Sequence, residues 1–280
     1  MHLLAIDAIS ILETTRDLLF FVSFVAIILY LFTRTPLFTD FVLFEKRSKK
    51  GTLKLILLGS ALGILASEFG IPFPEGTMAD IRLTISLIFG VIGGPWVGIP
   101  VGLASGLYRL SGLFWEGFRG GLGYRFAIGG FISTFGAGIL GGILHRRGVT
   151  AHNVRKNTKK ILLVTILWCT ITYEIICPLT AALLPGMGFA EAFYISNQRL
   201  FIPEMISDVF AIMVFSLFLG GIVTEEMREV RKLRKLVERY SERIGPEAQW
   251  IARDVEKDFE IERMIEKKPL KRKKKGGGQR

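Results

Sequence analysis

Cysteine and histidine are scarce in this chain of 280 residues. The two cysteines, Cys169 and Cys177, lie eight residues apart within one apolar stretch. The three histidines are widely separated, at His2, His145 and His152. Zinc sites and disulfide frameworks need clustered or regularly spaced Cys and His, so neither is expected here. We therefore expect no metal and no cofactor, and we interpret the cysteines as small buried apolar residues.

Charged side chains are rare in six long apolar blocks. The blocks cover residues 17–33, 52–69, 83–108, 126–144, 161–183 and 200–223. A helix needs roughly 20 apolar residues to cross about 30 Å of hydrocarbon, and a charge at its centre costs several kcal/mol. The pattern therefore predicts a multi-pass membrane protein. Acidic residues precede the first block where a signal peptide would be basic, so we expect that block to remain as a helix.

Basic residues mark the segments that face the cytoplasm. Lys and Arg gather in loops 33–51 and 145–160 and in the tail after Gly221, whereas segments 66–80 and 184–198 are acidic. Basic loops stay on the cytoplasmic side of a membrane. The sequence therefore predicts a bacterial inner-membrane protein with its N-terminus outside and its C-terminus in the cytoplasm.

Two apolar segments, 81–93 and 96–108, are too short to be ordinary spans. They are joined by Gly93-Gly94-Pro95, and each covers only about 20 Å at 1.5 Å per residue. They form either two thin crossings or one re-entrant hairpin. The predicted fold is an all-α polytopic membrane bundle of six to seven membrane segments with a cytoplasmic helical tail. Broken helices require surrounding protein or water, so a polar site is expected nearby.

Glycines recur every four residues along the second of these short segments. They are Gly94, Gly98, Gly102 and Gly106. On a helix this spacing places them on one face, where small residues let backbones approach closely. We interpret them as packing residues, and a substrate path through the same bundle is a compatible alternative.

The chain changes character after residue 223. Residues 224–244 carry apolar side chains three and four apart and are predicted to form a coiled coil. Gly245-Pro246 ends this seam, and 247–266 is a second amphipathic stretch. Residues 267–280 are a basic tail that does not fold alone. Its expected partner is anionic lipid rather than nucleic acid. The predicted divisions are thus 1–223, 224–266 and 267–280.

Ionisable residues inside or beside membrane segments are the best candidates for a site, because each is expensive unless paired or solvated. Arg82 and Arg109 begin and end the short pair, so a hairpin would bring them together. Two guanidinium groups suit a small carboxylate or phosphate. Alternatively, the arginines reach the outer interface or pair with Asp80 and Glu116. The other embedded or flanking polar residues are Glu174, Arg199, Glu204 and Asp208.

Several motifs occur in a particular order. They are Thr33-Arg34-Thr35-Pro36-Leu37-Phe38, Met78-Ala79-Asp80-Ile81-Arg82, Ile92-Gly93-Gly94-Pro95-Trp96-Val97-Gly98, Gly102-Leu103-Ala104-Ser105-Gly106-Leu107-Tyr108-Arg109, Ile132-Ser133-Thr134, Gly138-Ile139-Leu140-Gly141-Gly142, and Pro203 with Asp208. Their order and spacing resemble the LytS-type five-transmembrane receptor domain of sensor histidine kinases. The resemblance covers about residues 17–223.

This resemblance implies a membrane receptor that feeds a cytoplasmic output in two-component signalling. The family is linked to control of cell-wall hydrolases and, in some members, to sensing extracellular pyruvate. In pyruvate-sensing relatives two arginines, a Cys and a Ser are implicated in the ligand site. The matching positions here are Arg82, Arg109, Gly130 and Ser133, with Asp80 beside them. Because Gly130 replaces the Cys, the resemblance implies a small carboxylate rather than pyruvate in particular.

The chain departs from the family pattern at several positions. Asp80 stands for the family's Asn, Tyr108 for its His, Ala137 for its membrane Glu, and Asp208 for another Asn. About ten extra residues lie near 114–125. These changes alter charge and hydrogen bonding around the expected site, so ligand identity is the least transferable property.

No histidine follows His152, and no glycine-rich ATP-binding segment follows the membrane domain. We therefore expect no autophosphorylation by these 280 residues, and no enzyme activity. The leading hypothesis is a sensor that passes its signal to a cytoplasmic partner, or to a second copy, through 224–244. A small-solute transporter or importer subunit is the main alternative, and a structural anchor is a third.

Overall fold

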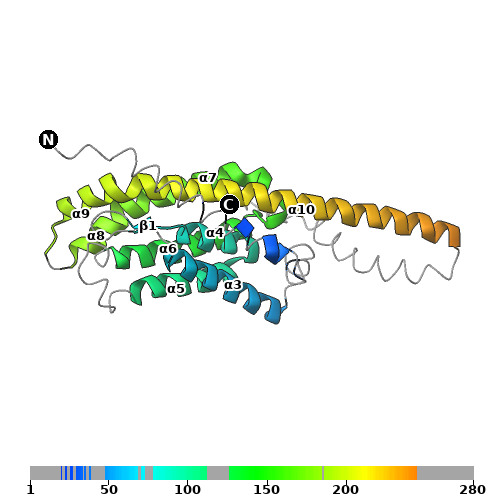
Figure 1. The fold of residues 1–280 in the computed structure, drawn as a ribbon, viewed down its shortest axis with the longest axis horizontal. Coiled ribbons are helices and arrows are strands. Elements are labelled where there is room, and N and C mark those ends of the chain that lie inside the picture. Colours follow the sequence, from blue (N-terminus) through cyan, green and yellow to red (C-terminus); the bar gives the residue numbers. More distant parts are fainter. Residues whose placement is uncertain are drawn as a thin grey trace, which may run out of the picture. The chain divides into compact units, whose positions relative to one another are not determined.

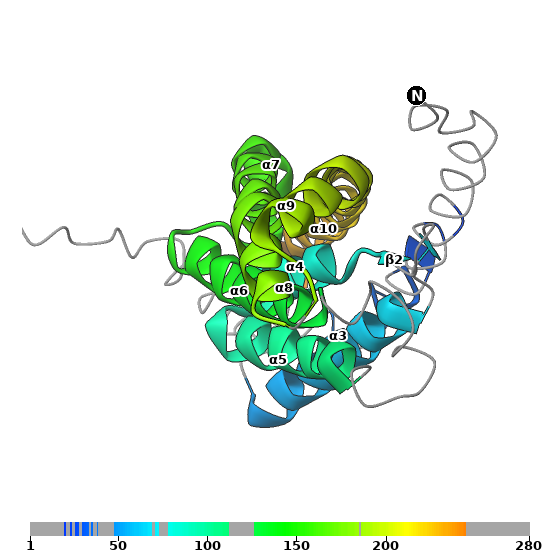
Figure 2. The same ribbon diagram turned by 90° about the vertical axis from the view of Figure 1, so that its left-hand side faces the viewer.

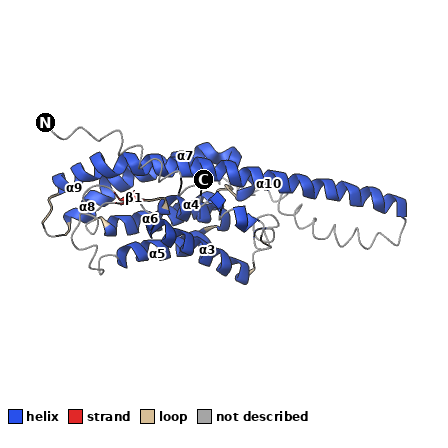
Figure 3. Cartoon of the chain, in the orientation of Figure 1, coloured by secondary structure: helices blue, strands red, loops and turns tan. Residues whose placement is uncertain are grey.

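The apolar runs of the sequence form α-helices in the structure, which is a computed structural model (Figure 3). It describes residues 48–68, 71–72, 78–111, 126–184 and 186–244, together with positions 20, 23, 26, 27, 30–33, 35 and 38. In chain order the elements are α3 (Lys49–Glu68), β1 (Ile71–Pro72), β2 (Met78–Ala79), α4 (Arg82–Gly93), α5 (Pro95–Ser111), α6 (Ala127–Arg146), the 3-10 turn η6 (Ala151–Asn153), α7 (Val154–Ile171), the π-helical η7 (Thr172–Ile176), α8 (Cys177–Ala182), α9 (Phe189–Ile195), the π-helical η8 (Ser196–Phe201) and α10 (Ile202–Ile244). β1 and β2 pair antiparallel, with Ile71 opposite Ala79.

Four helices of the described part are long and apolar enough to cross a membrane. They cover Lys49–Glu68, Ala127–Arg146, Ala151–Ala182 and Glu204–Leu233. The fold is therefore a polytopic helical membrane bundle, and the predicted class is confirmed. The first predicted block, 17–33, lies mostly outside the described residues, although the positions described within it are helical.

The helices form two layers around α4. Figures 1 and 2 show α3, α5 and α6 on one side of α4, and α7 with α10 on the other. Every residue of α4 is buried, from Arg82 to Gly93. With 12 residues, α4 is about 18 Å long. It is too short for an ordinary span, and the neighbouring helices keep it away from lipid.

A tight turn at Gly94 joins α4 to α5. Gly94 has a φ of 76°, in the left-handed region that glycine adopts without strain. A Cβ at this position would lie 3.1 Å from the ring of His145, near the basic end of α6. The Nδ1 atom of His145 is 2.7 Å from the carbonyl oxygen of Val91. The hairpin thus reaches the depth of the C-terminal end of α6, and both of its open ends lie near the start of α6.

Glycines bring α5 and α6 into backbone contact. A Cβ at Gly98 would lie 2.4 Å from the carbonyl oxygen of Gly138, and one at Gly138 would lie 2.1 Å from that of Gly98. A Cβ at Gly102 or Gly106 would likewise come within 2.8 Å of α6 atoms. The opposite side of α5 exposes large apolar side chains, namely Trp96, Ile99, Leu103 and Leu107. This division leaves α5 with one protein-facing and one lipid-facing side.

The chain divides into two compact units after Thr224. In the second unit, α10 continues to Ile244, immediately before Gly245-Pro246 in the sequence. Leu233 and Leu236 are exposed there. The predicted amphipathic stretch 247–266 and basic tail 267–280 lie outside the described residues, as does the insertion near 114–125.

Candidate functional site

The hairpin brings the two candidate arginines together. Arg82 is the first residue of α4, and Arg109 lies in the last turn of α5. Their exposed fractions are only 6% and 7%, so both are buried within the protein. A Cβ at Gly130 of α6 would lie 3.8 Å from Arg109 Cγ and 3.9 Å from Arg82 Nη2. The two arginine side chains therefore both approach Gly130.

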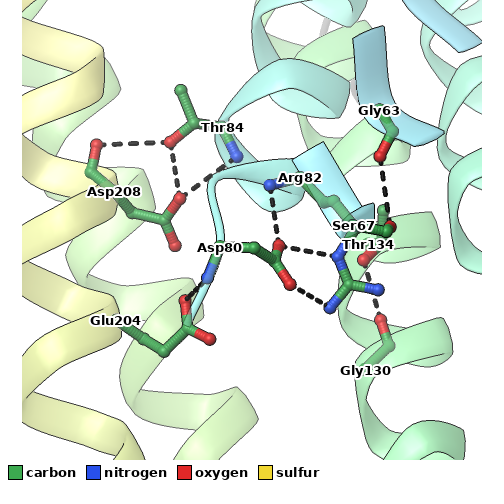
Figure 4. A network of polar contacts seen from close by, with 9 residues as sticks. All are labelled: Gly63, Ser67, Asp80, Arg82, Thr84, Gly130, Thr134, Glu204 and Asp208. Atoms are coloured by element: carbon green, nitrogen blue, oxygen red, sulfur yellow. Dashed lines mark hydrogen bonds and ion pairs between the residues drawn. The ribbon is translucent and has the colours of Figure 1, made fainter. Parts of the chain in front are cut away.

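Asp80 holds Arg82 from the segment between β2 and α4. Arg82 Nε donates a hydrogen bond of 2.6 Å to Asp80 Oδ1, and Nη2 forms an ion pair with Oδ2. The pair is therefore bidentate, as the sticks in Figure 4 show. Arg82 Nη1 makes no hydrogen bond to any described residue. Of the two interpretations left open by the sequence, pairing with Asp80 is thus observed for Arg82, together with the convergence on Arg109.

Asp208 of α10 accepts hydrogen bonds at the buried N-terminal end of α4. The first backbone N–H groups of a helix have no acceptor within the helix. Ile81, at the N-cap of α4, has no side-chain oxygen that could accept a hydrogen bond from them. Asp208 Oδ1 accepts hydrogen bonds from the Thr84 backbone N–H (3.3 Å) and from the Thr84 hydroxyl (2.6 Å). Asp208 Oδ2 lies 3.6 Å from the Cys169 thiol, which donates to it. A fully buried carboxylate is thereby supplied with three donors.

Glu204 ties the same helix to the segment before α4. Its Oε2 accepts a hydrogen bond of 3.3 Å from the backbone N–H of Asp80. Glu204 and Asp208 are one turn apart on α10, and their partners Asp80 and Thr84 are also four residues apart. Figure 4 shows Asp80 between Glu204 on one side and Arg82 on the other. Asp80 therefore links the arginine site to α10.

Other predicted site residues lie away from this ion pair. Ser133 is buried, and its hydroxyl is 3.1 Å from the Thr172 hydroxyl. Glu174 accepts a hydrogen bond of 2.7 Å from Asn197. The side chain of Arg199 lies outside the described part. The structure thus brings together Asp80, Arg82, Arg109, Gly130, Glu204 and Asp208, whereas a role for Ser133 in binding stays a prediction.

Sequence reasoning missed the neutral partners in this network. Thr84 and Cys169 both donate to Asp208, and Thr172 faces Ser133. Tyr108 donates to Glu68 of α3 and so joins the open end of the hairpin to a neighbouring helix. The contact of Thr84 with Asp208 could have been anticipated. The N-terminal N–H groups of a buried helix need acceptors, and Asp208 is an acceptor within a membrane segment. The remaining partners carry no recognisable sequence motif, and their contacts depend on how segments distant in the sequence pack together.

Two buried arginines give the arrangement the kind of donor groups that anion binding needs. Arg82 is paired with Asp80, and the second buried arginine, Arg109, approaches the same glycine, Gly130. The described residues contain no group of three or more His, Cys, Asp or Glu able to hold a metal ion. A planar guanidinium grips a carboxylate with paired hydrogen bonds, as it already grips Asp80.

Comparison with known proteins gives matches in one family. The family described as 5TMR of 5TMR-LYT matches residues 35–222. Sensor histidine kinase BtsS of Escherichia coli K12 is 33% identical over 128 residues, which are 44% of this chain and 21% of BtsS. Sensor histidine kinase YpdA of the same organism is 29% identical over 83 residues, covering 30% of this chain and 14% of YpdA. The chain thus spans about a fifth or less of these relatives. No solved structure matches.

Proposed function

Because this chain belongs to the 5TMR-LYT family of membrane receptor domains, we propose that it senses a small carboxylate at the Arg82–Arg109 site. A role in membrane signalling follows from the family, whose matching members here are sensor histidine kinases. The observation that supports a carboxylate is the convergence of two buried arginines over Gly130. Buried cations are costly without anionic partners, and paired guanidinium groups fit carboxylates in shape and charge.

The signal would leave the site along α10. A ligand shifts an equilibrium only if it binds two states with different affinity. Glu204 and Asp208 fasten α10 to the start of α4, so a change at Arg82 alters what holds α10 in place. Since α10 continues to Ile244, we infer that the signal passes along it to a partner or to a second copy of the chain. Control of cell-wall hydrolases stays a prediction about that output.

A thermal-shift screen of the purified full chain in lipid nanodiscs tests the site. We expect at least one of acetate, pyruvate, lactate and succinate to raise Tm by about 5 °C at saturating concentration. Arg82→Ala should abolish that shift, because the site then loses its bidentate donor. Arg109→Lys keeps a positive charge but loses the planar fork, and should weaken the response.

The matched control is Arg147→Ala, which removes an exposed arginine just beyond the opposite end of α6. It should leave the shift unchanged. A shift that survives Arg82→Ala, or the lack of any shift with the four carboxylates, would count against the assignment.

Orientation in the inner membrane is the second part of the proposal, with the N-terminus and the arginine site at the outer side. Both native cysteines are buried, so thiol labelling has a low background. We expect a membrane-impermeant maleimide to label Gly188→Cys in intact spheroplasts and Arg147→Cys only after permeabilisation. Neither substitution meets an obstacle, because Gly188 has open space and Arg147 is exposed. The reverse labelling pattern would show that the protein is inserted in the opposite orientation.

Transport is the alternative function, and the buried broken hairpin α4–α5 is the observation that favours it. Transporters bind substrates at discontinuous helices near the membrane midplane. Proteoliposomes that accumulate a radiolabelled carboxylate identified in the screen would support transport, whereas binding without uptake would support sensing.

A further inference from the structure

We propose that Asp80 is a tethered competitor of the external ligand, so that binding exchanges one carboxylate for another at Arg82. This inference rests on the proposed function and adds a regulatory role for a residue of the same site. The Asp80 carboxylate occupies the Nε–Nη2 edge of Arg82, which is the edge a free carboxylate would use for two parallel hydrogen bonds.

The geometry favours exchange over addition. Arg82 and Asp80 are each at least 94% buried, so a second carboxylate cannot reach the same edge while the pair is intact. Arg82 Nη1 is buried and has no hydrogen-bond partner among the described residues, which leaves one donor nitrogen for an incoming anion to engage. Asp80 itself lies between β2 and α4 rather than within a helix, so its departure from Arg82 breaks the hydrogen bond of 2.9 Å that its Oδ1 accepts from the Arg82 backbone N–H but no hydrogen bond within the helix.

The charges give the exchange a direction. Asp80 neutralises Arg82, and without this contact the charge of Arg82 would stand near Arg109, since both side chains approach Gly130. An incoming carboxylate can take over that neutralisation and engage both arginines. A tethered group competes at an effective concentration set by its short link, in the millimolar range or above. Asp80 therefore competes with the ligand for Arg82, and this competition raises the ligand concentration needed for a response.

The exchange also supplies a route to α10. Asp80 uses its carboxylate for Arg82 and its backbone N–H for Glu204 of α10. When the carboxylate leaves Arg82, the segment that carries it moves, and its N–H contact to Glu204 changes with it. The Thr84–Asp208 contact lies one turn deeper and supplies the second attachment of α10. Occupancy of Arg82 is thereby coupled to the first turns of α10.

Chemical rescue provides the test, because acetate is the Asp side chain without its tether. The full chain with Asp80→Ala is titrated in nanodiscs with sodium acetate at constant ionic strength, with chloride as the balancing anion. We expect acetate to raise the Tm of this variant by about 5 °C, whereas its uncharged analogue acetamide has no effect. Adding Arg82→Ala to the same variant should remove the rescue.

The isosteric variant Asp80→Asn tests competition even if Asp80→Ala does not fold. With the tethered charge removed, half-maximal stabilisation by acetate should need about tenfold less acetate than in the wild type. Asp80→Glu keeps a tethered carboxylate and should stay close to the wild type. If Asp80→Asn requires as much acetate as the wild type or more, Asp80 only positions Arg82 and the exchange is wrong.

The two proposals fail separately. If carboxylates stabilise the wild type through Arg82 but Asp80→Asn binds them no more tightly, the sensor site stands and the exchange falls. If none of the four carboxylates stabilises the wild type, and acetate stabilises neither Asp80→Ala nor Asp80→Asn, both fall. If acetate stabilises the wild type, Asp80→Ala and Arg82→Ala equally, the effect does not arise at Arg82 and the exchange is overturned.

Discussion

Replacing Gly98 by alanine should destabilise the bundle by about 3 kcal/mol. The added Cβ would lie 2.4 Å from the carbonyl oxygen of Gly138 and 2.6 Å from the Cα of Gly90. Both obstacles are backbone atoms, so no side chain can turn away, and α5 must separate from both α4 and α6. Alanine is otherwise the better helix former by about 1 kcal/mol, so the measured loss is the clash minus that gain. Unfolding by SDS in mixed micelles measures it.

Gly221→Ala is the matched control. Gly221 lies within α10, and a Cβ there meets nothing within 4 Å. The same substitution should therefore leave stability unchanged or raise it by up to about 1 kcal/mol. If Gly98→Ala and Gly221→Ala behave alike, the close approach of α5 and α6 is wrong.

Thr84→Val should destabilise the protein by about 2 kcal/mol while Asp208 is present, and by much less in an Asp208→Ala background. Valine has the shape of threonine but lacks the hydroxyl, which donates a hydrogen bond of 2.6 Å to Asp208 Oδ1. Hydrogen bonds to charged groups contribute about 1.5–3 kcal/mol, and a buried carboxylate that loses a donor has no water to replace it. Once Asp208 is replaced by alanine, the Thr84 hydroxyl no longer donates a hydrogen bond to a carboxylate. The difference between backgrounds is the coupling between α4 and α10.

Thr170→Val is the control for this pair of measurements. Thr170 is on the same kind of apolar helix, but its hydroxyl bonds to the carbonyl oxygen of Ile166 in its own helix and is exposed. This substitution should change stability by less than about 0.5 kcal/mol in either background. Additive effects of Thr84→Val and Asp208→Ala would mean that the contact does not couple the two helices.

Much of the architecture was predictable because it depends on local patterns. The lengths of the apolar blocks predicted membrane helices, which the long helices confirm. The family resemblance, carried by motifs in order, is confirmed by the match over residues 35–222. Gly93-Gly94-Pro95 predicted the break between two short helices, because glycine allows the positive φ of Gly94 and proline begins the next helix easily.

The site was predictable only in part. Spacing along a hairpin predicted that Arg82 and Arg109 meet, because both lie at its open end. It could not choose between an anion site and pairing with Asp80, and the structure contains both the pair and the convergence. The depth of the hairpin was also open, since nothing local to residues 81–108 says that Gly94 lies beside His145.

The sequence alone determined that this chain is a multi-pass helical membrane protein of a receptor family, because hydrophobic length and motif order are properties of contiguous residues. Only the tertiary structure decided which charges meet. Glu204 and Asp208 are 124 residues from Asp80 and Thr84, and their partnership arises from α10 packing beside the start of a buried helix. A buried carboxylate must find donors wherever the fold provides them, and no pattern within one segment specifies a donor in another.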